Sequence, residues 1–314
     1  MRTTAEILKT FDLPARDAYD LPASRKRFGD GGQYRVEIPS CEGPRALEAI
    51  GAAADEHAVP IHRISQGSGI MLQTDDEIRA MVALGAARAM EVCLFVGPRA
   101  NWDTGVQASS ASGRVLGCSL RGIDQLVFGL EDVRHAAELG IRSVLVADIG
   151  QLSILGRMKS AGDLPPDFVL KVSVTLAAAN PASARVLEDL GATSINLPVD
   201  LSLPQIAAIR AAVDAPIDFY VEAPDDFGGT VRHYEIPELV RIAAPIYLKF
   251  GLRNAPGIYP AGQHLESAVL ALSRERVRRA AIGLAILRRY APDAVASPLP
   301  VQPSLMNAGE GCPP

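Results

Sequence analysis

The chain has few cysteines, few aromatic residues and no long apolar segment. Its 314 residues include four cysteines with no Cys-X-X-Cys spacing, so nothing indicates a zinc site, an iron–sulfur site or a disulfide framework. No apolar stretch approaches the roughly 20 residues that a membrane-spanning helix needs. Residues 1–30 also lack the apolar core of a signal peptide. We therefore expect a soluble, cytoplasmic protein with no membrane partner.

The chain also has no large excess of charge of either sign. The formal net charge is −5, and acidic and basic residues are interspersed along the chain. Nucleic-acid binding needs a basic stripe or patch, so the sequence argues against a nucleic-acid partner. A small-molecule or peptide-like substrate remains the expected partner. The oligomeric state is left open, a homo-oligomer included.

What the sequence does have is a rhythm of short apolar runs that alternate with helix-like stretches. Hydrophobic residues make up 48% of the chain, which is ample for a core. The runs are residues 34–40, 60–65, 91–99, 142–148, 168–174, 193–200, 216–224 and 245–253. Short buried strands joined by crossover helices predict a parallel sheet, and eight such units favour closure into a barrel. The fold class predicted is α/β, a single-domain (β/α)8 TIM barrel.

The segments outside the rhythm set the predicted boundaries. Residues 1–33 are expected to form a leader that covers the N-terminal mouth of the barrel. The barrel itself is predicted over residues 34–290, and the Pro/Ala/Gly-rich residues 291–314 are expected to be a disordered tail. The connection from about residue 100 to 121 is unusually long and carries the single tryptophan, Trp102. Connections of this length are often lids, so we expect it to close over a site.

Polar residues recur on one face of the predicted strands. Side chains alternate between faces, and the outer face of a barrel strand must be apolar to pack on helices. The polar face is therefore expected to point inward. It comprises Arg35, Glu37, Arg63, Lys171, Ser173, Ser194, Asn196, Asp218, Tyr220, Glu222, Tyr247 and Lys249. Four of these residues are positive and three are negative, and buried charges must pair or reach solvent.

The position of each polar residue along its strand separates structural from catalytic candidates. Barrel active sites lie at the carboxyl ends of the strands. We therefore predict that Arg35 and Asp218, deeper in their strands, are structural ion-pair members. The predicted catalytic residues are Glu37, Lys171, Glu222 and Lys249. The predicted substrate-binding residues are Arg63, Arg99, Asn196, His233 and Arg253.

Several chemistries could use this set. Carboxylates beside lysines suit general acid–base catalysis, and a desolvated lysine suits imine formation with a carbonyl substrate. Glu37, Asp148 and Glu222 could instead hold Mg²⁺ or Mn²⁺, although Asp148 is out of phase with the inward face. No other cofactor is indicated. Cys41 with His62 is a further nucleophile–base candidate, but His62 is out of phase with Arg63.

Three segments carry a family resemblance. Residues 247–272, in which Arg253 follows Lys249 by four positions, residues 37–50 and residues 219–224, ending near Glu222, are similar to the U32 peptidase family. The chain departs from the family at Gly251-Leu252, where Glu-Gly is usual. It also lacks the cysteine cluster of many members, so their iron–sulfur-linked activities are not implied.

The resemblance implies a TIM barrel and a hydrolase acting on a small polar or anionic substrate at the carboxyl-end mouth. It supports Glu222, Lys249 and Arg253 as site residues. The sequence has no protease nucleophile motif and no zinc motif. A lyase or aldolase, a metal-dependent isomerase and a non-catalytic binding or scaffold barrel therefore stay open as alternatives.

Overall fold

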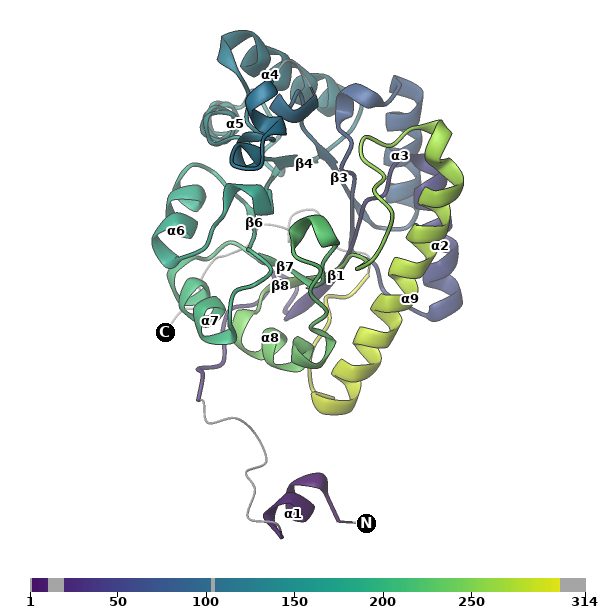
Figure 1. The fold of residues 1–314 in the computed structure, drawn as a ribbon, viewed down its shortest axis with the longest axis vertical. Helices are drawn as coiled ribbons and strands as arrows, with labels where there is room; N and C mark the ends of the chain where they lie inside the picture. Colours follow the sequence, from purple (N-terminus) through teal and green to yellow (C-terminus); the bar gives the residue numbers. More distant parts are fainter. Residues whose placement is uncertain (1, 11–19, 103–104, 300–314) are drawn as a thin grey trace.

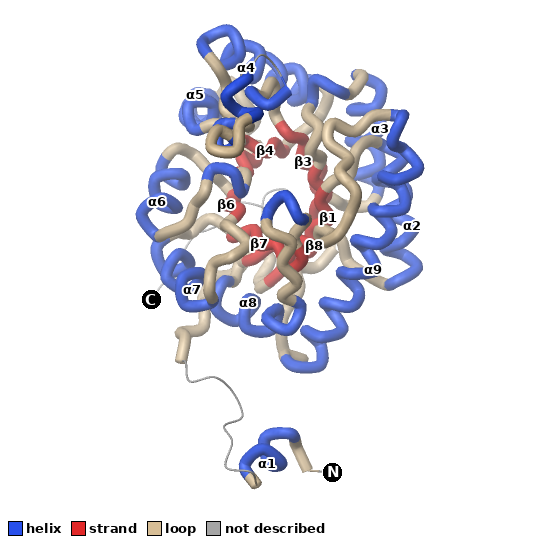
Figure 2. Tube along the Cα trace, in the orientation of Figure 1, coloured by secondary structure: helices blue, strands red, loops and turns tan. Residues whose placement is uncertain are grey.

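Eight parallel strands form a closed barrel surrounded by helices (Figures 1 and 2). The computed structural model describes residues 2–10, 20–102 and 105–299. The strands pair in sequence order, and the ring closes because the first strand pairs with both the second and the eighth. The predicted (β/α)8 TIM barrel is confirmed.

The bounds of the elements follow the predicted rhythm. The strands are β1 (Tyr34–Pro39), β2 (Arg63–Ser65), β3 (Glu91–Phe95), β4 (Ser143–Val146), β5 (Val169–Val172), β6 (Ser194–Asn196), β7 (Ile217–Glu222) and β8 (Ile246–Phe250). The helices are α1 (Thr4–Lys9), α2 (Pro44–His57), α3 (Asp75–Ala87), α4 (Gly122–Glu138), α5 (Ile149–Ala161), α6 (Pro181–Asp189), α7 (Leu203–Ala212), α8 (Ile236–Ala243) and α9 (Glu266–Tyr290). Helix α1 lies apart from the barrel in Figure 1.

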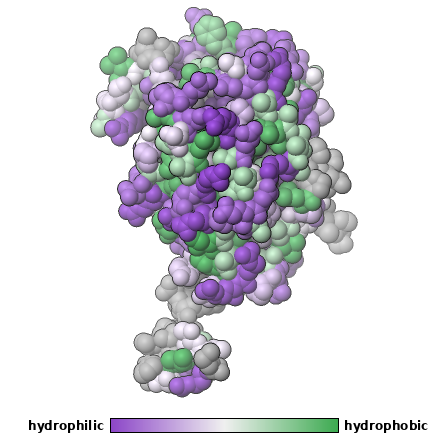
Figure 3. Space-filling model, turned by 90° about the vertical axis from the view of Figure 1, so that its right-hand side faces the viewer, coloured by the Kyte–Doolittle hydropathy of each residue, from purple (hydrophilic) through white to green (hydrophobic). Residues whose placement is uncertain are grey.

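The hydrophobic core lies between the ring of strands and the ring of helices. The outward-facing Val36 and Ile38 of β1 are fully buried in the same cluster as Leu47 and Ile50 of α2. The outer face of α2, α3 and α9 intersperses hydrophilic residues with smaller hydrophobic groups (Figure 3). Within the described part of the chain, no helix has the length and apolar character to cross a membrane.

Local signals in the sequence determine where several helices begin. Thr74 caps α3, and its side chain and that of Glu77 satisfy each other's backbone N–H groups in the predicted capping box. Pro44 occupies the first turn of α2, where its missing N–H costs no helical hydrogen bond. Such starts place the loops that precede the helices at the carboxyl ends of the strands.

Two segments from opposite ends of the chain close the amino-end mouth of the barrel. The guanidinium of Arg35 lies 4.0 Å from the ring centre of Phe28 and donates to Asp30 Oδ2 at 2.9 Å. Arg35 Nε also donates to Ser297 Oγ at 2.9 Å, and Ser297 N donates to the carbonyl of Tyr34 at 3.0 Å. Residues near position 30 therefore cover this mouth, together with residues 295–297.

The tail prediction needs a correction. Residues 291–299, assigned to the disordered tail, are ordered by backbone hydrogen bonds to Gln33 and Tyr34 and by burial of Ser297. Composition does not reveal these contacts, because they are made with residues more than 260 positions earlier. Residues 300–314, the rest of that predicted tail, lie outside the described residues.

Replacing Ser297 by Ala should lower the free energy of unfolding by about 2 kcal/mol, since Arg35 Nε loses its acceptor while it stays buried. Urea denaturation would measure the change. Ser160→Ala is the matched control, because the exposed Ser160 hydroxyl donates only to a carbonyl of its own helix. The control should change the free energy by less than about 0.5 kcal/mol. Equal losses in both variants would contradict the role of Ser297.

Candidate active site

The charged residues predicted to point inward meet on the barrel axis, with Glu37 among them. Glu37 Oε2 contacts Lys171 Nζ and lies 3.3 Å from Arg63 Nη1. Glu37 Oε1 accepts from Ser65 Oγ at 2.7 Å and lies 3.5 Å from Lys249 Nζ. The structure thus brings together three predicted catalytic residues, Glu37, Lys171 and Lys249.

The surroundings of these groups shift their proton affinities. Burial alone would raise the pKa of Glu37, but the positive charges of Lys171, Lys249 and Arg63 outweigh burial and hold the pKa well below its usual value. Burial lowers the pKa of Lys171, and the negative charges of Asp218 and Glu37 oppose that effect. Glu37 is therefore ionised at neutral pH, and Lys171 loses its proton more readily than an ordinary lysine does.

Arg63 connects the acidic residues below this cluster. Its Nε donates to Glu91 Oε1 at 2.8 Å, and its Nη1 donates to Asp218 Oδ1 at 2.9 Å. The guanidinium lies 3.5 Å from the ring centre of Tyr247. Arg63 is only 2% exposed and pairs with acidic residues inside the barrel, and its predicted role in substrate binding stays a prediction.

Lys249 is held differently from the other interior cations. With its amide oxygen turned inward, Asn196 presents that oxygen 2.9 Å from Lys249 Nζ, while the amide nitrogen donates to the carbonyl of Asp218. The ring centre of Tyr220 lies 4.0 Å from Nζ. The carboxylate in contact with Lys249 is that of Glu37, whose Oε1 lies 3.5 Å from Nζ. Lys249 therefore has mostly neutral partners, at the end of the barrel where active sites lie.

Glu222 does not join this cluster. Tyr220 pairs with Lys249, but Glu222 pairs with Phe250, so the strand register shifts at the residue between them. This β-bulge turns Glu222 away from the barrel axis. Glu222 Oε2 lies 3.2 Å from His233 Nε2 and 3.6 Å from Arg279 Nη1. The expectation that Glu222 points inward is wrong, because a regular period of two does not continue through a bulge.

His233 and Arg253 accompany Glu222. Burial would raise the pKa of Glu222, but the close contact with His233, a hydrogen bond from the backbone N–H of Arg253 and the charge of Arg279 hold it below its usual value. The Arg253 side chain is 61% exposed and lies 4.0 Å from Asp225. These predicted site residues form a second group beside the barrel mouth.

Arg99 occupies the loop that follows β3. Its guanidinium contacts two aromatic rings, 3.5 Å from the ring centre of Phe95 and 3.9 Å from that of Trp102. It donates to the carbonyl of Gly67, and its Nε is buried without a hydrogen-bond partner. Burial lowers the pKa of Arg99 to about 10. The guanidinium is therefore packed against aromatic rings but makes few hydrogen bonds to offset its burial.

The predicted metal ligands do not come together. Asp148 caps α5, accepting from the backbone N–H of Gln151 at 2.9 Å and from that of Leu120 at 3.1 Å. Glu37 and Glu222 have the separate partners described above. Within residues 2–10, 20–102 and 105–299, no three His, Cys, Asp or Glu side chains group as a metal site would require.

The Cys41–His62 pair is also not formed. Burial raises the pKa of the Cys41 thiol well above its usual value. His62 Nδ1 accepts from the backbone N–H of Val36 at 3.0 Å, and Nε2 lies 3.0 Å from the carbonyl of Ser297, near the amino-end mouth. Cys41 follows the carboxyl end of β1, so the two residues serve opposite ends of the barrel.

Sequence reasoning missed two acidic members of the interior network, Asp30 and Glu91. Glu91 begins β3 in phase with the inward Cys93, so its alternation could have identified it. Asp30 lies in a turn with no periodicity, and only its contact with Arg35 reveals its role. With Glu37 and Asp218 they balance the four interior cations, Arg35, Arg63, Lys171 and Lys249.

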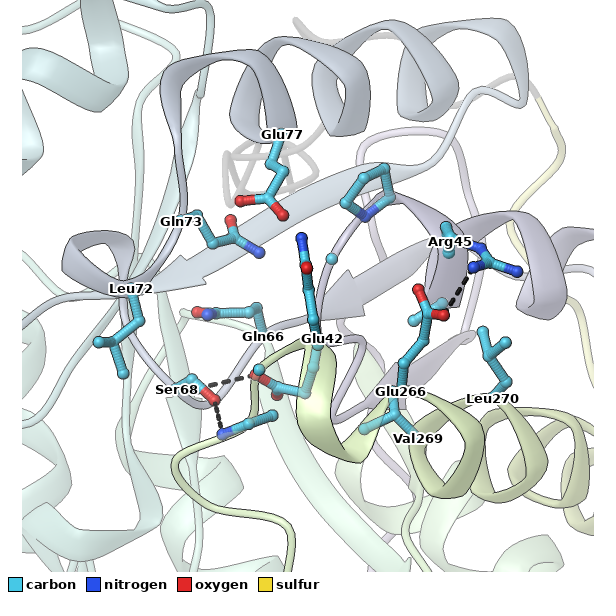
Figure 4. Close-up of a pocket in the computed structure, with 16 residues that line it drawn as sticks. Glu42, Arg45, Gln66, Ser68, Leu72, Gln73, Glu77, Glu266, Val269 and Leu270 are labelled. Atoms are coloured by element: carbon cyan, nitrogen blue, oxygen red, sulfur yellow. Dashed lines mark hydrogen bonds and ion pairs between the residues drawn. The ribbon is translucent and has the colours of Figure 1, made fainter.

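A pocket of about 200 Å³ opens beside the mouth, between the loops that follow β1, β2 and β8 (Figure 4). Glu42 lines it and accepts from the backbone N–H groups of Gly67 at 2.7 Å and Ser68 at 3.1 Å. Burial raises the pKa of Glu42. None of the predicted catalytic side chains lines this pocket, so it lies outside the interior cluster.

The fold and the interior cluster define a TIM barrel with an ionic interior. A family model described as Peptidase family U32 matches residues 124–223, from α4 to just past the end of β7. This match confirms the resemblance over those residues. Residues 37–50 and 247–272, which also carry the resemblance, lie outside the match. No curated protein matches the chain.

Solved structures to which the chain is similar are remote in sequence. The U32 peptidase Mk0906 is 17% identical, over 78% of this chain and 99% of that chain, with a TM-score of 0.42. A Coccidioides immitis protein assigned as a fructose-1,6-biphosphate aldolase is 11% identical, over 83% of this chain and 94% of that chain, with a TM-score of 0.51. The second likeness supports the barrel fold alone.

Proposed function

We propose that the chain is an enzyme that performs acid–base chemistry on a small anionic carbonyl compound, as a lyase rather than a hydrolase. The substrate would bind at the carboxyl-end mouth of the barrel. Lys249 would face the carbonyl oxygen and stabilise the negative charge that develops when an adjacent C–H or C–C bond breaks. Glu37, ionised and 3.5 Å from Lys249 Nζ, would position that ammonium. Lys171, whose pKa burial lowers, would accept the proton in its neutral form.

The observation that carries this proposal is the environment of Lys249. Its ammonium is surrounded by a neutral amide, an aromatic ring and a carboxylate shared with two other cations. A buried cation that is incompletely neutralised can interact strongly with a developing oxyanion, because few competing charges and little water screen it.

The thiol groups give a reason to prefer a lyase over a hydrolase. Burial raises the pKa of Cys41, of Cys93 (to about 12) and of Cys118, so these thiols are poor nucleophiles at neutral pH. His62 is committed to the amino-end mouth and His233 to Glu222. The lysine–carboxylate pair inside the barrel suits bond cleavage next to a carbonyl.

A substrate must displace part of the mouth to reach Lys249, which is only 1% exposed. Tyr220 covers the ammonium, and Phe227 of η6 (Asp225–Phe227) stacks on Tyr220 with ring centres 6.1 Å apart. In Figure 1, the green turn that follows β7 lies over the ring of strands. Gly228, with φ of 101°, permits its tight end. We expect this turn to open, and closure by the Trp102 loop stays a proposal.

Proton exchange tests this function without knowledge of the natural substrate. Incubation with pyruvate in D₂O should produce enzyme-dependent loss of the methyl proton signal in the NMR spectrum. Lys249→Met should slow the exchange by at least about tenfold, because the charge that stabilises the enolate is gone. Lys159→Met is the control, since Lys159 lies on α5 and donates to the carbonyl of Phe168.

Two outcomes decide between versions of the proposal. Exchange by wild-type protein that survives Lys249→Met would contradict the role of Lys249, and no exchange with pyruvate or other small 2-oxo acids would contradict the function. Where exchange is observed, borohydride reduction during the incubation would distinguish imine formation from electrostatic stabilisation by the ammonium. A mass increase at Lys249 or Lys171 indicates an imine, and no increase indicates electrostatic catalysis.

The balanced interior charges favour one alternative, a non-catalytic binding barrel. Arg35, Arg63, Lys171 and Lys249 are matched in number by Asp30, Glu37, Glu91 and Asp218, as a purely structural network would require. Under this alternative, Lys249→Met changes the free energy of unfolding but no exchange reaction is ever observed.

A further inference from the structure

We infer that Arg99 is an oxyanion-binding subsite at the carboxyl-end mouth, which takes a carboxylate or phosphate group of a ligand. The inference rests on the proposed function only in assigning that ligand as the substrate. The first observation in support is that the guanidinium of Arg99 is buried without an acidic partner. Arg99 is 6% exposed, and among the residues that the structure describes no carboxylate forms an ion pair with it.

The polar contacts of Arg99 are few. One of its N–H groups donates to the carbonyl of Gly67, and Nε has no partner although it is buried. A guanidinium carries five donors, and hydrogen bonds to a buried charge are needed to offset its desolvation. An oxyanion would supply both the missing acceptors and the missing counter-charge.

The aromatic rings determine how a ligand could approach. Phe95 and Trp102 both contact the guanidinium through their rings, at 3.5 and 3.9 Å from the ring centres. A guanidinium presents its flat surface to an aromatic ring most favourably, which leaves its N–H edges to hydrogen-bond acceptors. A carboxylate or phosphate binds such an edge with two parallel hydrogen bonds, a geometry that lysine cannot reproduce.

The groups around Arg99 place it over the mouth. The titratable side chains close enough to influence Arg99 are Cys118, Tyr259 and Glu42, which lie on the loops after β3, β8 and β1. Phe95, on which Arg99 stacks, belongs to the cluster of residues inside the barrel. Arg99 therefore lies at the end of the barrel that also holds Lys249.

Glu42 does not substitute for a ligand. Its carboxylate accepts from the backbone N–H groups of Gly67 and Ser68, on the turn whose carbonyl accepts from Arg99. That turn lies between Glu42 and Arg99, and the structure has no ion pair between the two side chains. Glu42 holds the turn in position and leaves the edge of Arg99 to another acceptor.

Arg210 is an instructive contrast. It is 3% exposed, burial lowers its pKa to about 10, and its Nε is also unpartnered. Its remaining donors bind the carbonyls of Val213 and Ala215, just past the end of α7. Arg210 thus terminates a helix, which explains its burial, whereas Arg99 makes only one such contact.

Titration with inorganic phosphate and with acetate, at constant ionic strength maintained by NaCl, tests the inference. Calorimetry on wild-type protein should detect binding of at least one of the two anions, and the arm that binds identifies phosphate or carboxylate. Arg99→Gln should weaken that binding by about tenfold or more. Arg99→Lys, which keeps the charge, should also weaken it, because the two-pronged contact is lost.

Arg210→Gln is the matched control and should bind the anion as wild type does, whatever its melting temperature. Equal affinity in wild type and both Arg99 variants, or no binding of either anion by wild type, would overturn the inference. Pyruvate exchange separates this failure from failure of the proposed function. If the anion binds through Arg99 but wild-type protein exchanges no pyruvate protons, only the proposed function fails. If wild-type protein exchanges pyruvate protons and Arg99→Gln leaves the KM unchanged, only the subsite fails.

Discussion

Replacing Arg63 by Met should lower the free energy of unfolding by about 3–5 kcal/mol. The substitution preserves most of the side-chain volume but removes the cation that Glu37, Glu91 and Asp218 share. Those carboxylates remain inside the barrel. Glu37 and Asp218 keep Lys171 as a partner, but Glu91 loses the cation with which it pairs and stays buried. Urea denaturation followed by circular dichroism would measure the change.

Arg79→Met is the control for this experiment. Arg79 also pairs with two carboxylates, Asp75 and Asp76, but its side chain is 55% exposed. Solvent screens such pairs, so the loss should stay below about 1 kcal/mol. Adding Glu91→Gln to Arg63→Met should restore part of the lost stability, because one uncompensated charge is removed. No recovery in the double variant would argue against the charge explanation.

Acid should destabilise the fold through His62 by about 3 kcal/mol as the pH falls from 6.5 to 4. Burial lowers the pKa of His62 to about 4, and the positive charge of Arg35 acts in the same direction. The folded state therefore favours the neutral ring, so its contribution is complete above pH 6.5 and is lost as the pH falls toward 4. Protonation would place a proton on Nδ1, which accepts from Val36 N–H.

The measurement compares the free energy of unfolding at pH 7 and pH 4 in wild type and in His62→Asn. The Asn oxygen can occupy the place of Nδ1 but does not titrate. Wild type should lose about 3 kcal/mol more than the variant over this range. His264→Asn, at an exposed position, should lose as much as wild type. A parallel loss in wild type and His62→Asn would assign the acid sensitivity to other groups.

The barrel could be predicted because its signals are local and repeated. Each strand alternates polar and apolar residues, and capping residues such as Thr74 mark helix starts within a few positions. The inward position of Lys171 and Lys249 follows from the same period of two. These features need no knowledge of distant partners, so the sequence displays them directly.

The parts that could not be predicted depend on irregular backbone or on distant contacts. The bulge between Tyr220 and Glu222 reverses the direction of the Glu222 side chain, and the residue types at that position do not predict a bulge. Asp30 and Ser297 enter the network from segments without periodicity. Whether an arginine has an acid beside it, as Arg63 has and Arg99 lacks, depends on residues far apart in the chain.

The closure of the amino-end mouth by Ser297 has a consequence for synthesis of the chain. Arg35 and His62 belong to the first two strand–helix units, yet each binds an atom of a residue made more than 230 positions later. At roughly 5–20 residues per second, these two groups wait about ten seconds or longer for that partner. The first strands thus emerge from the ribosome with polar groups that only the last described segment can satisfy. Closure of the amino-end mouth therefore follows the synthesis of all eight strands.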